Sequence, residues 1–121
     1  MGKPAARLID ADVKLKVRLF GAGTFQILSL RVSKAEKGAR IAIKCKRGCS
    51  LQRVSVLRGR TQTFDTIFRG RKFRAGSVLE IRITKAQRVG RFVRYRITRS
   101  DIVGTECRIT TKGKLTGCAP K

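Results

Sequence analysis

Apolar and polar residues alternate along most of the chain with a period of two, which is the pattern of a β-strand that buries one face. The segment DVKLKVRLF predicts such a strand, with an apolar face made of Val13, Leu15, Val17 and Leu19. ARIAIKC repeats the pattern, and LQRVSVL and TQTFDTIF follow it more weakly. No stretch shows a sustained helical period, so we expect an all-β protein.

The segment TFQILSLRV breaks the alternation in its middle. A regular strand here would place Leu28, Leu30 and Val32 on one face. Phe25 and Ile27 would then fall on the opposite face. We expect a strand with this division of its apolar residues.

Two later segments, VLEIRIT (78–84) and FVRYRIT (92–98), predict an antiparallel hairpin joined by the residues KAQRVGR. We place Thr84 opposite Phe92, because the apolar residues then share one face and a slip by one residue would turn them outward. The resulting apolar pairs are Ile83 with Val93, Ile81 with Tyr95, and Leu79 with Ile97.

The same register sets the polar face of this hairpin. It places Arg82 opposite Arg94 and Glu80 opposite Arg96. The second pair is favourable, but like charges directly across a sheet repel each other. The hairpin is therefore expected to carry an uncompensated pair of arginines.

Glycines at the ends of these runs supply the turns. About seven or eight strands then fit an antiparallel two-sheet sandwich, and a small closed β-barrel is the alternative. We expect a poorly ordered lead-in over residues 1–11, one domain over 12–118, and a tail over 119–121. The final segment TECRITTKGKLTGC predicts a short hairpin with its tip at residues 112–114.

The net charge of the chain indicates which classes of partner it is expected to bind. It has 30 Lys and Arg against 7 Asp and Glu in 121 residues, a formal net charge of +23. Repulsion at this density works against a compact state, so we expect anionic partners such as nucleic acid, an anionic polymer or lipid headgroups. The chain has no His and one Tyr, and it lacks a phosphate-binding loop, so we expect neither an enzyme nor a cofactor.

Localisation is less constrained by the sequence. No run approaches the ~18 apolar residues of a membrane-spanning segment. The start MGKPAARLID lacks the apolar core of a secretion signal. We therefore expect either an intracellular protein or a mature domain cut from a longer precursor.

The four cysteines form two close pairs, Cys45 with Cys49 and Cys107 with Cys118. A zinc site and a redox motif usually need two intervening residues, which neither pair has. Unpaired structural thiols are a further alternative. We favour two local disulfides, because each pair brackets a turn, and we expect no metal. Disulfides in turn imply an oxidising compartment.

Three parts of the sequence together resemble an uncharacterised module of secreted and cell-surface proteins of actinobacteria. They are IKCKRGC, then IFRGRKFRAGSVLEIRITKAQRVGRFVRYRITR, and then the late cysteine pair. The resemblance implies an immunoglobulin-like β-sandwich, export from the cell and an accessory role without catalysis. The positions that match its motifs are Cys45, Cys49, Phe68, Gly70, Arg71, Phe73, Gly76, Arg94 and Tyr95.

Our first functional hypothesis is a non-catalytic module at the cell surface or outside the cell, either binding anionic cell-wall polymer or another polyanion, or serving as a structural or adhesive domain. Guanidinium groups suit contacts with phosphate and carboxylate, although exposed arginines also simply solvate a sheet. The candidate anion-binding residues are Arg18, Arg31, Arg69, Arg71, Arg82, Arg91, Arg94 and Arg96.

The alternative is an intracellular nucleic-acid-binding protein that acts through phosphate contacts. So many cations would give salt-sensitive, largely nonspecific affinity. Recognition of single strands also needs exposed aromatic side chains for bases to stack on. Tyr95 is predicted to face inward, and we expect Phe64, Phe68, Phe73 and Phe92 to pack in the core or at sheet edges.

Overall fold

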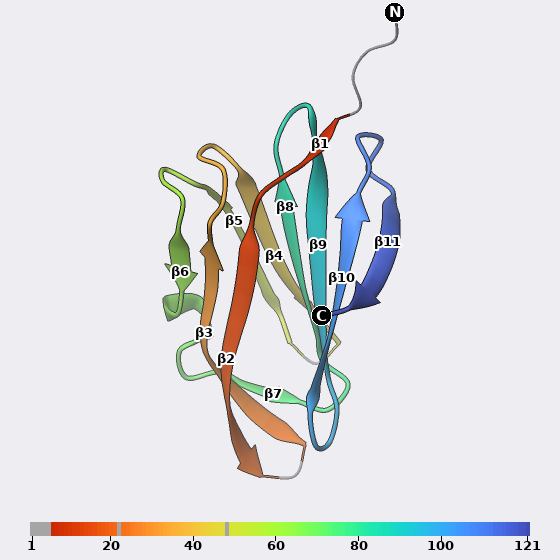
Figure 1. Cartoon of the computed structure of the whole chain (residues 1–121). Coiled ribbons are helices and arrows are strands. Elements are labelled where there is room, and N and C mark those ends of the chain that lie inside the picture. The colour runs from red at the N-terminus through yellow and green to blue at the C-terminus, as the bar shows by residue number, and fades with distance from the viewer. Residues whose placement is uncertain (1–5, 22, 48) are drawn as a thin grey trace, which may run out of the picture.

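The structure is a computed structural model that describes residues 6–21, 23–47 and 49–121. Its described residues form eleven β-strands and one 3-10 helix (Figure 1). In chain order these elements are β1 (Arg7–Leu8), β2 (Asp12–Gly21), β3 (Thr24–Ser33), β4 (Arg40–Lys46), β5 (Leu51–Val56), β6 (Gln62–Phe64), η1 (Thr66–Phe68), β7 (Lys72–Arg74), β8 (Val78–Thr84), β9 (Arg88–Ile97), β10 (Ile102–Ile109) and β11 (Leu115–Pro120).

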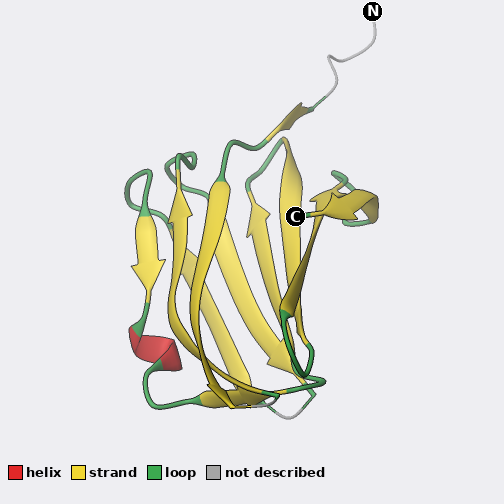
Figure 2. Ribbon diagram, turned by 60° about the horizontal axis from the view of Figure 1, so that its bottom comes forward, coloured by secondary structure: helices red, strands yellow, loops and turns green. Residues whose placement is uncertain are grey.

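The strands form two sheets that lie face to face (Figures 1 and 2). The larger sheet has seven strands in the order β11-β10-β9-β8-β4-β5, and β1 joins β9 in parallel. The smaller sheet has four strands, with β2-β3-β6 in order and β7 also paired to β3. The predicted all-β two-sheet sandwich is confirmed, and the sheets do not close into a barrel. Three strands of two or three residues, β1, β6 and β7, bring the number above the seven or eight expected.

The main core lies between the two sheets. Strands β4 and β8 of the larger sheet contribute Ile41 and Ile81, and β3 contributes Leu30, all fully buried. The ring of Phe68 packs edge-on against that of Phe73, with 6.1 Å between their centroids. This packing explains why the segment around η1 stays attached to the smaller sheet.

The break in the alternation of β3 is a β-bulge. Lys16 pairs with Ser29 and Val17 pairs with Ile27, so Leu28 is an extra residue on β3. The bulge returns Phe25 and Ile27 to the buried face that Leu30 and Val32 also occupy, and it leaves Leu28 exposed. Our assignment of these residues to opposite faces was wrong, because it assumed a strand without a bulge.

The apolar side chains of β2 become more exposed toward its C-terminal end. Val13 is buried, Leu15 and Val17 are partly buried, and Leu19 is 55% exposed. Leu19 keeps the predicted alternation and pairs with the buried Phe25, but it is exposed because β2 is the edge strand of the smaller sheet.

The hairpin of β8 and β9 is shifted by two residues from the predicted register. Leu79 pairs with Tyr95 and Ile81 with Val93, so the apolar face is kept. On the polar face Glu80 now pairs with Arg94. The predicted opposition of Arg82 and Arg94 was wrong, since a shift of two replaces that repulsion with an ion pair and leaves each side chain on its face.

The predicted C-terminal hairpin is confirmed, and it lies at the edge of the larger sheet (Figure 2). The amide of Thr110 donates to the carbonyl of Lys114 at its tip, 2.8 Å away. Across this hairpin Cys107 and Cys118 form a disulfide. The second predicted disulfide, between Cys45 and Cys49, closes the turn between β4 and β5.

Both ends of the described chain contact the sandwich. β1 pairs with β9, and Ile9 is completely buried in the core. The amide of Lys121 donates to the carbonyl of Gly104, 3.0 Å away.

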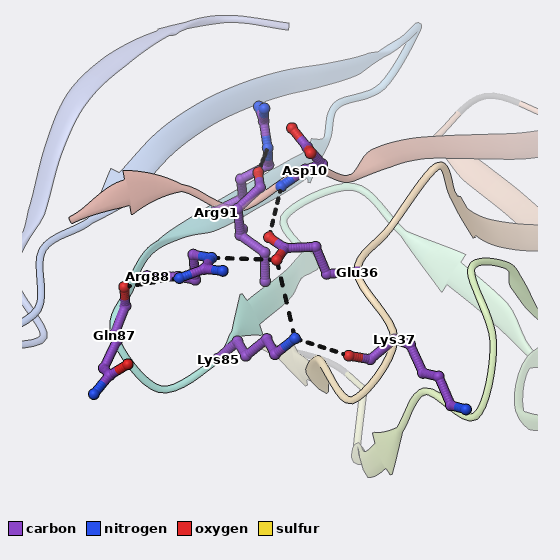
Figure 3. A network of polar contacts seen from close by, with 8 residues as sticks. Asp10, Glu36, Lys37, Lys85, Gln87, Arg88 and Arg91 are labelled. Carbon is purple, nitrogen blue, oxygen red and sulfur yellow. Dashed lines mark hydrogen bonds and ion pairs between the residues drawn. The ribbon is translucent and has the colours of Figure 1, made fainter.

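Glu36 holds the N-terminal segment against the larger sheet (Figure 3). It accepts hydrogen bonds from the Asp10 amide at 3.3 Å and from Arg88 at 3.2 Å, and Lys85 lies 3.9 Å away. Burial raises the pKa of Glu36, but the hydrogen bonds from Asp10 and Arg88 and the charges of Arg88 and Lys85 together hold that pKa below its usual value. The carboxylate therefore stays charged at neutral pH and joins three segments that are distant in sequence.

Gly90 lies where β9 packs closely against its neighbouring strands. A Cβ at this position would lie 2.7 Å from the carbonyl oxygen of Ile83 and 3.3 Å from the side chain of Ile109. We expect Gly90→Ala to lower the free energy of unfolding by about 2–3 kcal/mol, because backbone atoms must move to admit the methyl group. Urea denaturation measures this change. In the control Gly59→Ala the added atom meets nothing within 4 Å, so stability should change by less than about 0.5 kcal/mol. Equal effects of both substitutions would contradict the packing described.

The two disulfides should stabilise the fold to different extents. Their sequence separations are 4 for Cys45–Cys49 and 11 for Cys107–Cys118. Since the stabilisation grows with the loop that is closed, we expect the double alanine variants to lose about 2 and about 3 kcal/mol, respectively. Denaturation curves of the oxidised variants give these values, and the reverse order would count against this loop-length effect.

Candidate anion-binding face

Three adjacent strands of the larger sheet direct cations to its outer surface. In the register of β4, β8 and β9, Lys44 lies across from Glu80, which lies across from Arg94. In the next row Val78 lies between Lys46 and Arg96. Because side chains alternate along a strand, these residues share the face opposite the core. We call this surface the basic face, and its exposed cations are Lys44, Lys46, Arg47, Arg82, Arg94 and Arg96.

Glu80 lies at the centre of the basic face and is only 7% exposed. Lys46 Nζ is 2.9 Å from its Oε1, and Arg94 donates from Nε and Nη2 to its Oε2 at 3.2 and 3.0 Å. Burial raises the pKa of Glu80, but the hydrogen bonds and charges of Lys46 and Arg94 outweigh burial and lower that pKa below its usual value. Six cations around one carboxylate leave a local surplus of positive charge.

The basic face contains two shallow hollows that share Glu80. The larger hollow, about 320 Å³, is lined by Lys46, Arg47, Val78, Glu80, Arg94 and Arg96. The smaller hollow, about 180 Å³, lies toward β5 and includes Lys44, Gln52, Val54 and Arg82 in its lining. Both hollows are open to solvent and have cationic walls, which suits a flexible anionic ligand better than a compact apolar one.

Phe92 supports two of these arginines from below. Its side chain is 1% exposed and belongs to a second buried cluster with Cys107 and Ile109, separate from the main core. The guanidinium carbons of Arg82 and Arg94 lie 5.1 and 5.3 Å from its ring centroid. These cation–π contacts hold both side chains near the surface of the sheet.

The Cys45–Cys49 disulfide lies at the edge of the larger hollow. It closes a turn in which Arg47 adopts a φ of 58°, a left-handed conformation that favours glycine. The turn therefore holds Arg47 at the hollow despite an unfavourable backbone conformation. All four cysteine sulfurs are paired in the two disulfides, so none is a thiolate ligand for a metal. The described residues also contain no cluster of three or more His, Cys, Asp or Glu side chains that suits a metal.

The structure separates the eight candidate arginines. It brings Arg82, Arg94 and Arg96 together on the basic face. The outer side of the smaller sheet carries Arg18 and Arg31. The other three lie elsewhere, and they are Arg69, Arg71 and Arg91.

Arg69 and Arg71 follow η1, and Arg71 donates to the carbonyl of Ser50 at 3.1 Å. Arg91 is used within the fold. It donates to the carbonyl of Ile9 at 2.8 Å and to Glu106 at 3.0 Å. Its side chain is 24% exposed, so little of its hydrogen-bonding capacity faces solvent.

Sequence reasoning left three cations of the basic face out of the candidate site: Lys44, Lys46 and Arg47. The alternation of β4 already directs Lys44 and Lys46 away from the core. What the sequence did not show is that β8 pairs with β4, which brings these lysines beside Glu80 and Arg94.

No protein-family model matches the chain, and no curated protein or solved structure matches it. The family resemblance noted from the sequence therefore stays a hypothesis. Within the described part of the chain, no helix has the length and apolarity that crossing a bilayer requires.

The ion pairs of Glu80 predict a pH-dependent contribution to stability. Because the pKa of Glu80 is lowered in the folded state, its contribution is present above the usual value of 4.5 and is lost as the pH falls through the folded pKa. We expect Glu80→Gln to cost about 1–2 kcal/mol at neutral pH. The gap from the wild type should narrow as the pH falls below 4.5. Denaturation across this pH range measures the gap.

A suitable control is Glu106→Gln, which removes the same charge from a carboxylate with one cationic partner. It should cost less than Glu80→Gln at neutral pH. If Glu80→Gln were as stable as the wild type, the ion pairs would contribute nothing measurable to folding.

Proposed function

We propose that this protein is a non-catalytic extracellular or cell-surface module that binds an anionic cell-envelope polymer through the basic face. The ligand class is a flexible chain that carries repeated phosphate or carboxylate groups. The basic face would also serve a structural or adhesive role by attaching the protein to such a polymer.

The observation that carries this proposal is the arrangement of cations in rows across β4, β8 and β9. Adjacent strands are about 4.8 Å apart, and side chains two positions apart on one strand are about 7 Å apart. Lys46 and Arg96 are thus two strands apart in one row, and Lys44 and Arg94 are two strands apart in the next. A polymer with regularly spaced anionic groups can therefore contact several cations, whether it lies along the strands or across them.

Two features support a location outside the cell. Disulfides persist in oxidising environments, and this chain has two. The resemblance to secreted actinobacterial modules with paired cysteines and an immunoglobulin-like sandwich points the same way.

The alternative, a nucleic-acid-binding protein, has less support from the aromatic residues. Phe64, Phe68, Phe73, Phe92 and Tyr95 are all buried. Burial, with smaller effects from the charges of Glu106 and Asp12, raises the pKa of Tyr95 to about 12. These five rings are not platforms on which bases stack, so apart from the half-exposed ring of Phe20 nucleic acid would have to bind through its phosphates.

A matched pair of charge variants tests the proposal. The first, Lys44→Gln/Arg47→Gln/Arg96→Gln, removes three exposed cations from the basic face and leaves the ion pairs of Glu80 intact. The control, Lys14→Gln/Arg31→Gln/Arg60→Gln, removes the same charge from other exposed positions. We expect the first to weaken binding to poly(glycerol phosphate) about tenfold and the control to weaken it by about threefold or less, as measured by calorimetry.

Equal losses in the two variants would show that only total charge matters and would overturn the assignment of the basic face. Competition with single-stranded DNA at near-physiological salt provides a second readout. If DNA displaced the polymer and bound more tightly, the nucleic-acid alternative would replace this proposal.

A further inference from the structure

Several of the turns and loops that connect strands lie together at one end of the sandwich. The amide of Gly23, in the β2–β3 turn, donates to the carbonyl of Arg99 at 2.8 Å, and the amide of Ala75 donates to the carbonyl of Gly23 at 2.8 Å. The hydrogen bond from Arg71 to Ser50 adds the β4–β5 turn to the same group. These connections lie at the lower end of the molecule in Figure 1, where the β2–β3 hairpin projects. We call this part the turn end.

Two large apolar side chains that are adjacent in sequence are exposed at the turn end. Leu19 is 55% exposed and Phe20 is 47% exposed. They lie at the end of β2, beyond the part of the strand that packs on the core. Leu19 pairs with Phe25 and Gly21 pairs with Thr24, so Phe20 is the extra residue of a second bulge. Bulges change the direction of side chains, and here about half of the Phe20 side chain is exposed.

Two cations lie beside the Phe20 ring. Arg18 lies 5.3 Å and Lys72 lies 4.7 Å from the centroid of the Phe20 ring. The connections of the turn end carry four more exposed cations, and these are Arg69, Arg71, Arg74 and Arg99. The turn end therefore combines two exposed apolar side chains with six exposed cations.

We propose that the turn end is a peripheral membrane-binding site, in which Leu19 and Phe20 insert into a bilayer of anionic phospholipid. Apolar side chains gain free energy when they leave water for the acyl region, and cations beside them remain at the level of the headgroups. Lysines and arginines near an anionic leaflet are attracted to its negative surface potential. Neither contribution alone holds a protein firmly on a membrane, but the turn end provides both at one place.

The chemistry of the tip favours a bilayer over nucleic acid. A base could stack on Phe20, but Leu19 has no aromatic face and is equally exposed. A bilayer takes up both kinds of apolar side chain at the boundary of the headgroups and acyl chains. The proposal does not depend on polymer binding, because Lys44 and Arg96 of the basic face take no part in it.

A single tryptophan makes the insertion measurable, because the chain contains no Trp. In Phe20→Trp the only tryptophan lies at the proposed depth. With vesicles of equal parts phosphatidylglycerol and phosphatidylcholine, we expect its emission to shift to the blue and to be quenched by brominated acyl chains. With pure phosphatidylcholine, neither change should occur. The control Val56→Trp replaces a side chain that is 59% exposed on the larger sheet, and its emission should not change.

A second comparison measures affinity. Leu19→Ser/Phe20→Ser should reduce co-sedimentation with the anionic vesicles by roughly 10- to 30-fold, since each half-exposed side chain gives up its transfer into the bilayer. Val56→Ser/Leu115→Ser removes two exposed side chains elsewhere and should leave binding unchanged. Both variants change exposed residues, so unchanged thermal unfolding would confirm that each is folded.

The outcomes separate this proposal from the polymer-binding one. Loss of vesicle binding with intact poly(glycerol phosphate) binding in Leu19→Ser/Phe20→Ser supports insertion at the turn end. If the tryptophan of Phe20→Trp stayed unquenched on protein that still sediments with the vesicles, association would be purely electrostatic and the proposal would be overturned. Quenching of that tryptophan by single-stranded DNA, without any response to vesicles, would also overturn it and would indicate base stacking.

Discussion

The apolar interface between the two sheets has to hold together a chain with a formal net charge of +23. Three carboxylates lower this repulsion. Glu80 pairs with Lys46 and Arg94, Glu36 pairs with Lys85 and Arg88, and Glu106 pairs with Arg91. Each carboxylate joins segments that are separate in sequence, so the few acids act as cross-links between elements. The remaining positive charge lies on the surface, where water and counterions screen it.

Much of the fold follows from the sequence, because a period of two and glycine-bounded runs specify strands directly. Two errors arise when strand positions are predicted from this pattern alone. Periodicity cannot distinguish registers that differ by two residues. It therefore placed the β8–β9 hairpin two residues away from the observed register, in which Glu80 pairs with Arg94. Periodicity also assumes a regular strand, so it missed the bulge at Leu28. In the first case, excluding the like-charge pair of Arg82 and Arg94 would have ruled out the predicted register.

The candidate site was harder to predict than the fold. Arginines were chosen by their chemistry, but the surface depends on which strands are neighbours. The pairing of β4 with β8 joins parts of the chain about 40 residues apart, and such long-range pairing is not encoded in local alternation. It brings Lys44 and Lys46 next to Arg94. Conversely, Arg91 resembles its neighbours in sequence, but its guanidinium group donates hydrogen bonds to a backbone carbonyl and a carboxylate within the fold.

Strand β2 lies at the edge of the smaller sheet and is ten residues long. A long edge strand invites pairing with the same strand of another molecule, which leads to self-association. The exposed cations Lys14, Lys16 and Arg18 oppose this pairing, since two copies would bring like charges together. An anionic ligand that coats the surface removes this repulsion. Under the proposed function, the charge that would attract the ligand also keeps the free protein dispersed, and a polymer that gathers many copies would make edge-to-edge assembly more favourable.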